Sequence, residues 1–215
     1  MTKLSYRRLL ANGIDLIADN EIFTSIPNWN HYYISNHGRL IHESRKKNLN
    51  IVKPSFDKNT GYKTYTLSKP ARYYSGQKVR DKNGRIKQQR QCISSHRLVA
   101  IVYVSNDYPA SYRIEDMEVH HVNGNRTDNR DSNLLWVTSE DHGYIHTLRK
   151  IELMNTEGSG IFRKYNIKVA KDRLNLCTHD FVTMLKMAKG NGMEKFQVGK
   201  YWIKATYKNE RARAA

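Results

Sequence analysis

The chain has 215 residues, enough for one sizeable domain or two small ones, and its 39% hydrophobic residues allow a modest core. Its formal net charge of +17 makes a polyanion the expected partner, and its two cysteines, Cys92 and Cys177, exclude a disulfide framework and a CxxC zinc site. No stretch approaches the roughly 18 consecutive apolar residues of a membrane-spanning helix, and no secretory segment follows Met1, so we expect a cytoplasmic protein without a membrane partner.

The first third of the chain carries the signals of a short helix followed by antiparallel strands. An amphipathic helix is predicted within residues 5–17. Residues 21–41 alternate apolar and polar side chains on both sides of an Asn36-His37-Gly38 turn, which indicates a hairpin. The alternation over residues 62–67 indicates a further strand, with one face for packing and the other for DNA.

Residues 69–97 form a basic stretch in which Asp81 is the only acid. Gly76 and the Asn83-Gly84 pair indicate turns between short extended pieces. Such a β-ribbon could lie in a DNA groove or along the backbone, and a solvated basic loop is the alternative. The DNA-binding candidates in this stretch are Lys78, Arg80, Lys82, Arg85 and Lys87.

A buried helix is predicted next, over residues 94–103, because two serines suited to an N-cap precede a run of apolar helix formers. We expect it to pack on the strands that follow it in the chain. His96, near its start, is expected to be structural rather than catalytic, since the helix is predicted to be buried.

Residues 118–146 bring together side chains that bind metals and side chains that act as bases. A short strand predicted to begin at Met117 leads into two adjacent histidines, His120 and His121. Because successive strand side chains point to opposite faces, the two imidazoles cannot do the same job. The Asn123-Gly124 pair that follows favours a tight turn into a polar loop.

A second strand and a helix complete this segment. Residues 133–137 are apolar enough for a largely buried strand, and Thr138 is a suitable N-cap for a helix with His142 in its first turn. His146 lies one turn further on the same face, so chelation is geometrically possible. A phosphate contact or plain exposure of His146 is the alternative, and we do not assign it as a ligand.

The charge distribution sets this segment apart from its surroundings. Residues 115–141 carry 2 Lys/Arg against 7 Asp/Glu, whereas residues 1–114 carry 20 against 7 and residues 142–215 carry 15 against 6. This pattern suits a centre that concentrates a cation between flanks that bind phosphates. A solvated acidic loop is the alternative.

The order of strand, loop, strand and helix resembles the ββα-metal fold of the HNH nucleases, in particular the HNH homing endonucleases of phages and introns. Twelve residues separate His121 from Asn133, and nine separate Asn133 from His142, as in that family. The helix predicted before the motif and the strands from residue 21 also match in order, so the resemblance covers residues 21–146. The matching residues are His120-His121, Asn123-Gly124, Asp128-Asn129-Arg130, Asn133-Leu134, Trp136-Val137-Thr138 and His142.

The resemblance implies hydrolysis of DNA phosphodiester bonds with one divalent metal ion. It assigns the general base to His121, because an imidazole titrates near neutral pH, and metal binding to His120 and His142. Asn133 would orient the His121 ring. Mg²⁺ is the expected ion, with Mn²⁺ or Zn²⁺ as alternatives that two imidazoles would also accept. The phosphate-binding candidates in the loop are Arg126 and Arg130.

The last third of the chain is predicted to hold a small module. Residues 157–160 are typical of a linker, and helices over residues 167–176 and 178–188 suggest a helix-turn-helix with Lys186 facing a DNA groove. A small helical pair packed on the core is the alternative. Residues 196–206 indicate a terminal hairpin.

Together these patterns predict an α+β protein with a ββα-metal (HNH) core, an N-terminal antiparallel β module and a small C-terminal helical and β DNA-binding module. The expected function is an HNH homing endonuclease, phage-encoded and monomeric, that acts on double-stranded DNA without a small-molecule cofactor. The alternatives are a nicking or restriction enzyme without homing, and a catalytically silent DNA- or RNA-binding protein on an HNH scaffold. The expected parts are an N-terminal segment 1–20, a modular β region 21–92, the nuclease core 93–150 and a helix-turn-helix-like module 161–215.

Overall fold

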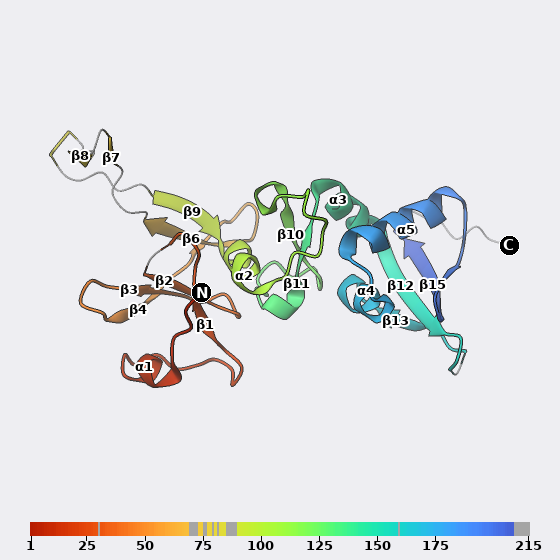
Figure 1. The fold of residues 1–215 in the computed structure, drawn as a ribbon, viewed down its shortest axis with the longest axis horizontal. Coiled ribbons are helices and arrows are strands. Elements are labelled where there is room, and N and C mark those ends of the chain that lie inside the picture. Colours follow the sequence, from red (N-terminus) through yellow and green to blue (C-terminus); the bar gives the residue numbers. More distant parts are fainter. Residues whose placement is uncertain are drawn as a thin grey trace. The chain divides into compact units, whose positions relative to one another are not determined.

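The structure is a computed structural model that describes residues 1–29, 31–68, 73–74, 77–78, 80, 82–84, 90–158 and 160–208, with only the backbone of 73–74 and 77–78. The chain divides into two compact units. The first unit contains Met1–Val104 and Asn125–Leu134, and the second contains Ser105–Gly124 and Leu135–Ala215. Both units mix helices with antiparallel sheets, which confirms the predicted α+β composition (Figure 1).

The first unit is built on two antiparallel sheets, ordered β1-β2-β3-β4 and β5-β6-β9, with β7 and β8 as a separate pair. The β2-β3 pair confirms the hairpin predicted around residues 36–38. Its helices are α1 (Tyr6–Leu10), α2 (Ser95–Tyr103) and the 3-10 helix η2 (Asp131–Asn133). Its strands are β1 (Phe23–Ser25), β2 (Tyr32–Ser35), β3 (Leu40–Glu43), β4 (Leu49–Val52), β5 (Ser55–Phe56), β6 (Lys63–Ser68), β7 (Tyr73–Tyr74), β8 (Gln77–Lys78) and β9 (Arg90–Ser94).

Helix α2 is buried in this unit, as predicted. The prediction that it packs on the strands that follow it is wrong, because its main strand contacts are with β2, β6 and β9, which precede it. Gly38, in the β2-β3 turn, has φ +89, and an added Cβ would lie 2.8 Å from Ser95 Oγ and 2.9 Å from Asn129 Cβ. The carbonyl of Gly38 also accepts hydrogen bonds of 2.9 Å from the hydroxyls of Tyr65 and Ser95. The turn therefore holds α2 and the polar loop around Asn129 close to the sheet. Only glycine fits at position 38.

Glu43 is a buried carboxylate that stabilises the first unit. It binds Arg8 at 2.9 Å, Lys47 at 3.1 Å and the hydroxyl of Tyr33 at 2.9 Å. Burial alone would raise the pKa of Glu43, but hydrogen bonds from Arg8, Tyr33 and Lys47 outweigh it and lower the pKa to about 2. Because this folded-state pKa lies below the unfolded value, the stabilisation is present above about pH 4.5 and is lost as the pH falls toward about 2.

We expect Glu43→Gln to lower the free energy of unfolding by about 1–2 kcal/mol at neutral pH, because an amide cannot accept these charged hydrogen bonds as strongly. The variant should also lose less stability than the parent between about pH 4.5 and 2. Urea denaturation over a series of pH values measures both effects. An acid sensitivity equal to that of the parent would contradict this assignment.

The second unit contains the two-stranded sheet β10-β11 and a four-stranded antiparallel sheet ordered β13-β12-β15-β14. Helices α4 and α5 and the β14-β15 hairpin confirm the elements predicted after residue 160. Its helices are η1 (Ile114–Asp116), α3 (Ser139–Thr147), α4 (Ile167–Leu174) and α5 (Thr178–Gly190). Its strands are β10 (Glu118–His121), β11 (Leu134–Val137), β12 (Leu148–Asn155), β13 (Arg163–Tyr165), β14 (Phe196–Val198) and β15 (Tyr201–Tyr207).

One hydrophobic core joins β11 and α3 to the C-terminal elements of the second unit. Leu135 and Ile145 pack with Phe181 and Leu185 of α5 and with Ile203 of β15. The segment 157–160, predicted as a linker, lies in the connection between β12 and β13, which pair antiparallel. The functional division of the chain into four parts stays a prediction. Within the described residues, no helix has the length and hydropathy needed to cross a membrane.

Candidate active site

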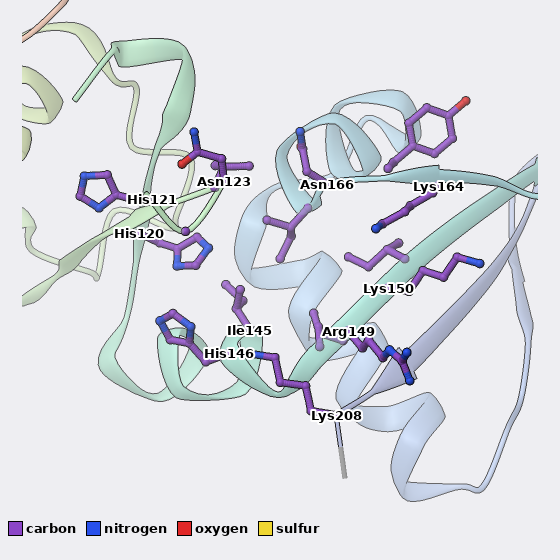
Figure 2. Close-up of a pocket in the computed structure, with 16 residues that line it drawn as sticks. His120, His121, Asn123, Ile145, His146, Arg149, Lys150, Lys164, Asn166 and Lys208 are labelled. Carbon is purple, nitrogen blue, oxygen red and sulfur yellow. The ribbon is translucent and has the colours of Figure 1, made fainter. Parts of the chain in front are cut away.

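Strand β10 places two adjacent histidines on opposite faces. His120 and His121 are both buried, at 6% and 5% exposure. Figure 2 shows the His120 ring turned toward His146 and the His121 ring turned away from both. The strand ends in the predicted turn, where the amide of Gly124 donates to the carbonyl of His121 at 2.9 Å. The two rings lie on opposite faces, as strand alternation predicts, and the different roles of the two imidazoles stay a prediction.

Helix α3 brings two further histidines to the His120 face. The helix begins as predicted, because Thr138 Oγ1 accepts a hydrogen bond of 3.1 Å from the amide of Asp141. Residues four apart lie on one helix face, so His142 and His146 both point toward β10. The ring centroids of both are 5.1 Å from that of His120.

These three histidines, which we call the histidine cluster, have the geometry of a metal site. One potential ligand atom from each of His120, His142 and His146 lies within 4.8 Å of the others. The Nε2 atoms of His142 and His146 are 3.1 Å apart. Two nitrogens bound to a tetrahedral metal at about 2.0–2.1 Å would be separated by about 3.3 Å. The cluster therefore fits one divalent ion with little movement.

His120 is in the protonation state that a metal requires. Burial, followed by the proximity of His142 and His146, lowers the pKa of His120 to about 3, so its ring is neutral at pH 7. Its Nδ1 atom is buried and has no hydrogen-bond partner among the described residues. A buried polar atom in that state costs about 1–3 kcal/mol unless something binds it.

Glu118 orients one of the three imidazoles. Its Oε2 lies 2.5 Å from Nδ1 of His142, which leaves Nε2 of the same ring directed at His146. A carboxylate that holds the far nitrogen of a histidine is the usual support of a metal-binding imidazole. The position of Glu118 could have been predicted from the sequence, because strand alternation puts it on the same face as His120.

We expect Glu118→Gln to weaken metal binding by about 10–100-fold, because the amide is a poorer partner for the His142 ring. Calorimetric titration of the metal-free protein with Zn²⁺ measures the affinity directly. Glu115→Gln is the matched control, since Glu115 is 72% exposed and its loss changes the net charge equally. Equal affinities of the two variants would show that Glu118 has no such role.

The polar loop of the first unit has its own network. Asn133 is 8% exposed, and its Nδ2 donates to the carbonyl of Asp128 at 2.8 Å. Arg130 binds the Asp128 carboxylate with two hydrogen bonds of 2.8 and 2.7 Å. Arg126 donates to the carbonyl of Thr60 at 2.8 Å. The proposed roles of Asn133 in orienting His121, and of both arginines in binding phosphate, stay predictions.

The other DNA-binding candidates have different surroundings. Arg80 is exposed and donates to the carbonyl of Gly84 at 2.7 Å, and Lys82 is exposed. Lys186 binds Asp141 at 2.7 Å and Glu140 at 2.6 Å, so it already has two acidic partners. Only the backbone of Lys78 is described, and Arg85 and Lys87 lie outside the described residues.

A pocket of about 500 Å³ opens beside the histidine cluster. His120, His121 and His146 line one part of it. Figure 2 shows Lys208 between these histidines and the basic side chains of β12 and β13. The basic lining residues come from positions far apart in the sequence and were not predicted as a group: they are Arg149, Lys150, Lys164 and Lys208.

Comparison with known proteins identifies the segment that carries the site. The family model for HNH endonuclease matches residues 109–144, which include β10, β11 and most of α3. The chain carries an HNH endonuclease motif. This confirms the resemblance predicted from the sequence, and His146 lies just beyond the matched segment.

Two known proteins are similar to the chain over more than the motif. An uncharacterised HNH endonuclease of Acanthamoeba polyphaga mimivirus is 30% identical over 130 residues, which is 60% of this chain and 26% of that protein. The chain thus spans about a quarter of the length of this relative. A solved structure of the HNH homing endonuclease I-HmuI, described with DNA binding and cleavage, is 21% identical. It aligns with 86% of this chain and 97% of its own, at a TM-score of 0.34, too low to establish a shared overall fold.

Proposed function

We propose that this chain is a metal-dependent DNA endonuclease that hydrolyses phosphodiester bonds. The observation that carries the proposal is that β10 presents its two histidines on opposite faces. His120 is buried and neutral and faces two more imidazoles, while His121 occupies the opposite face. Metal binding and proton transfer need different histidines, and this arrangement supplies both within one HNH motif.

The histidine cluster would hold the ion. His120, His142 and His146 each offer one nitrogen, and Glu118 fixes the ring of His142. When bound there, a divalent ion would supply positive charge at the scissile phosphate and the departing oxygen. From the sequence, with two imidazoles as ligands, Mg²⁺ is the expected ion, and that expectation is untested. The third imidazole, His146, leads us to propose zinc, nickel or another imidazole-preferring ion instead, because magnesium prefers oxygen ligands.

His121 is the proposed general base. Its imidazole takes a proton from a water molecule, whose oxygen attacks phosphorus as the bond from phosphorus to the 3′ oxygen breaks. The departing 3′ oxygen takes a proton from solvent water, and the products are a 5′-phosphate and a 3′-hydroxyl. Asn133 is proposed to keep the loop in a conformation that orients this ring, since its amide already holds the carbonyl of Asp128.

Double-stranded DNA is the proposed substrate, because the net charge of +17 favours a polyanion and phosphate contacts dominate the affinity for duplexes. One motif supplies one active site, so a monomer should nick one strand. We further propose the homing type, acting in the cytoplasm of the cell that holds the target DNA. A restriction or nicking enzyme of other biology would use the same chemistry.

Incubation of supercoiled plasmid with the protein in Mg²⁺, Mn²⁺, Zn²⁺ or EDTA tests this function. We expect metal-dependent conversion to the open circle, which EDTA prevents. Linear product at the earliest times would instead indicate two coordinated active sites. Retarded migration of the plasmid without cleavage in any metal would favour the alternative of a catalytically silent nucleic-acid-binding protein.

A further inference from the structure

We propose that Arg149, Lys164 and Lys208 form a phosphate-binding rim that holds the DNA strand beside the scissile phosphate. The inference rests on the proposed function and adds to it a binding surface from the C-terminal sheet. It also names cations that lie outside the HNH motif and outside the DNA-binding candidates of the sequence.

The charges of the pocket favour an anionic ligand. Four basic residues line it, and none of the described residues that line it is acidic. Lys150 already has an acidic partner, because its Nζ forms an ion pair with Oε1 of Glu152 at 2.6 Å. The remaining three are exposed, and within the described part of the chain none of them has an acidic partner within ion-pair distance. Cations in this state are available to a phosphate.

Lys208 is fixed in position next to the histidine cluster. Its backbone amide donates to the carbonyl of Thr147 at 2.8 Å, and Thr147 directly follows His146. The hydroxyl oxygen of the preceding residue, Tyr207, is hydrogen-bonded to that of Tyr144 at 2.7 Å. The end of β15 is therefore attached to the end of α3, and only the lysine side chain has to move to reach a ligand.

Arg149 and Lys164 extend the rim away from the histidines. The β12-β15 register shifts between Leu148 and Lys150, so Arg149 lies at an irregularity of the kind that redirects a side chain. Lys164 lies on β13 opposite Glu152. Helix α4 begins beside them, with Asn166 as its N-cap, and the positive end of its dipole adds to the field.

The shape of the pocket fits a segment of backbone rather than a single ion. Its volume of about 500 Å³ falls in the range of sites that hold whole organic ligands. His120 and His121 line the same pocket as the rim. A strand whose scissile phosphate lies at the histidines would therefore place its neighbouring phosphates along β12 and β13. Arg130, a phosphate-binding candidate from the sequence, differs from the rim residues because its guanidinium already makes two hydrogen bonds to the Asp128 carboxylate.

The test measures DNA binding without cleavage, using the His121→Ala protein in EDTA and a labelled duplex of unrelated sequence. We compare Lys164→Ala/Lys208→Ala with Lys195→Ala/Lys200→Ala, which removes two exposed lysines of the same unit. Lys200 lies at the far end of the sheet, where its carbonyl accepts from the amide of Thr156. The dissociation constant is measured over a series of salt concentrations.

We expect the rim variant to bind on the order of tenfold more weakly, with a salt slope smaller by about 2, since each lost phosphate contact contributes about 0.9 to that slope. The control pair should change both quantities little, and Lys164→Arg/Lys208→Arg should retain binding. Equal losses in the rim and control variants would overturn the rim while leaving the nuclease intact. No binding by the parent protein would instead contradict the proposed function itself.

Discussion

Replacing His121 with alanine is expected to reduce cleavage by at least about 10²–10⁴-fold, because a positioned general base contributes a factor of that size. DNA binding and metal binding should persist. His121 faces away from the histidine cluster, and the phosphate contacts that we propose come from other side chains. The measurement is the rate of plasmid nicking at saturating metal, together with the dissociation constant for DNA.

Imidazole added to the His121→Ala protein provides a sharper test of the base role. A soluble base that enters the emptied site should restore part of the rate, and the rescued rate should rise with pH as imidazole loses its proton. Such rescue is not expected for a variant that has lost a structural contact. Loss of DNA binding together with cleavage, or a lowered melting temperature, would show that His121 is mainly structural.

The parts of the site that were predictable from the sequence depend on neighbours along the chain. Strand alternation separates His120 from His121, the Asn123-Gly124 pair marks the turn, and Thr138 marks the start of α3. Each of these signals needs only a few consecutive residues. The structure places all three features as predicted.

Two residues of the site that the sequence did not assign, His146 and Glu118, depend on distances between elements. His146 is four residues after His142, but exposure and chelation are equally consistent with that spacing until the helix is packed against β10. In the sequence, Glu118 belongs to an acidic segment, and strand alternation alone puts it on the His120 face without identifying its partner. Its partner, His142, lies 24 residues away.

The strand pairing of the C-terminal sheet could not be predicted from local sequence patterns, because it also depends on contacts between residues far apart in the chain. Strand β12 pairs with β15 in a register that joins Leu148 to Tyr207 and Asn155 to Tyr201. Such long-range pairing is not encoded in any short window. The sequence predicted the two helices, but not the packing of α5 against α3 through Phe181 and Leu185. The basic rim of the pocket depends on this sheet.

Lys186 illustrates how packing changes the interpretation of a basic residue. From the sequence it is a candidate for a DNA groove, yet its ammonium binds Asp141 at 2.7 Å and Glu140 at 2.6 Å. Asp141 is 1% exposed and also accepts a hydrogen bond of 2.8 Å from Tyr108. Burial alone would raise the pKa of Asp141, but Lys186 and Tyr108 outweigh it and lower the pKa, so the carboxylate is charged.

Lys186→Met is expected to lower the free energy of unfolding by about 2–4 kcal/mol, because it leaves the buried Asp141 charge without its ammonium partner and with only Tyr108 and His179 beside it. The salt slope of DNA binding should not change. Lys204→Met, at an exposed position of β15, is the control and should change stability by less than about 0.5 kcal/mol. Urea denaturation and salt-dependent binding separate the two roles.

A slope reduced by about 1 with normal stability would restore Lys186 as a phosphate contact. The structure favours the first outcome, and since Asp141 directly precedes His142, metal affinity should fall with stability.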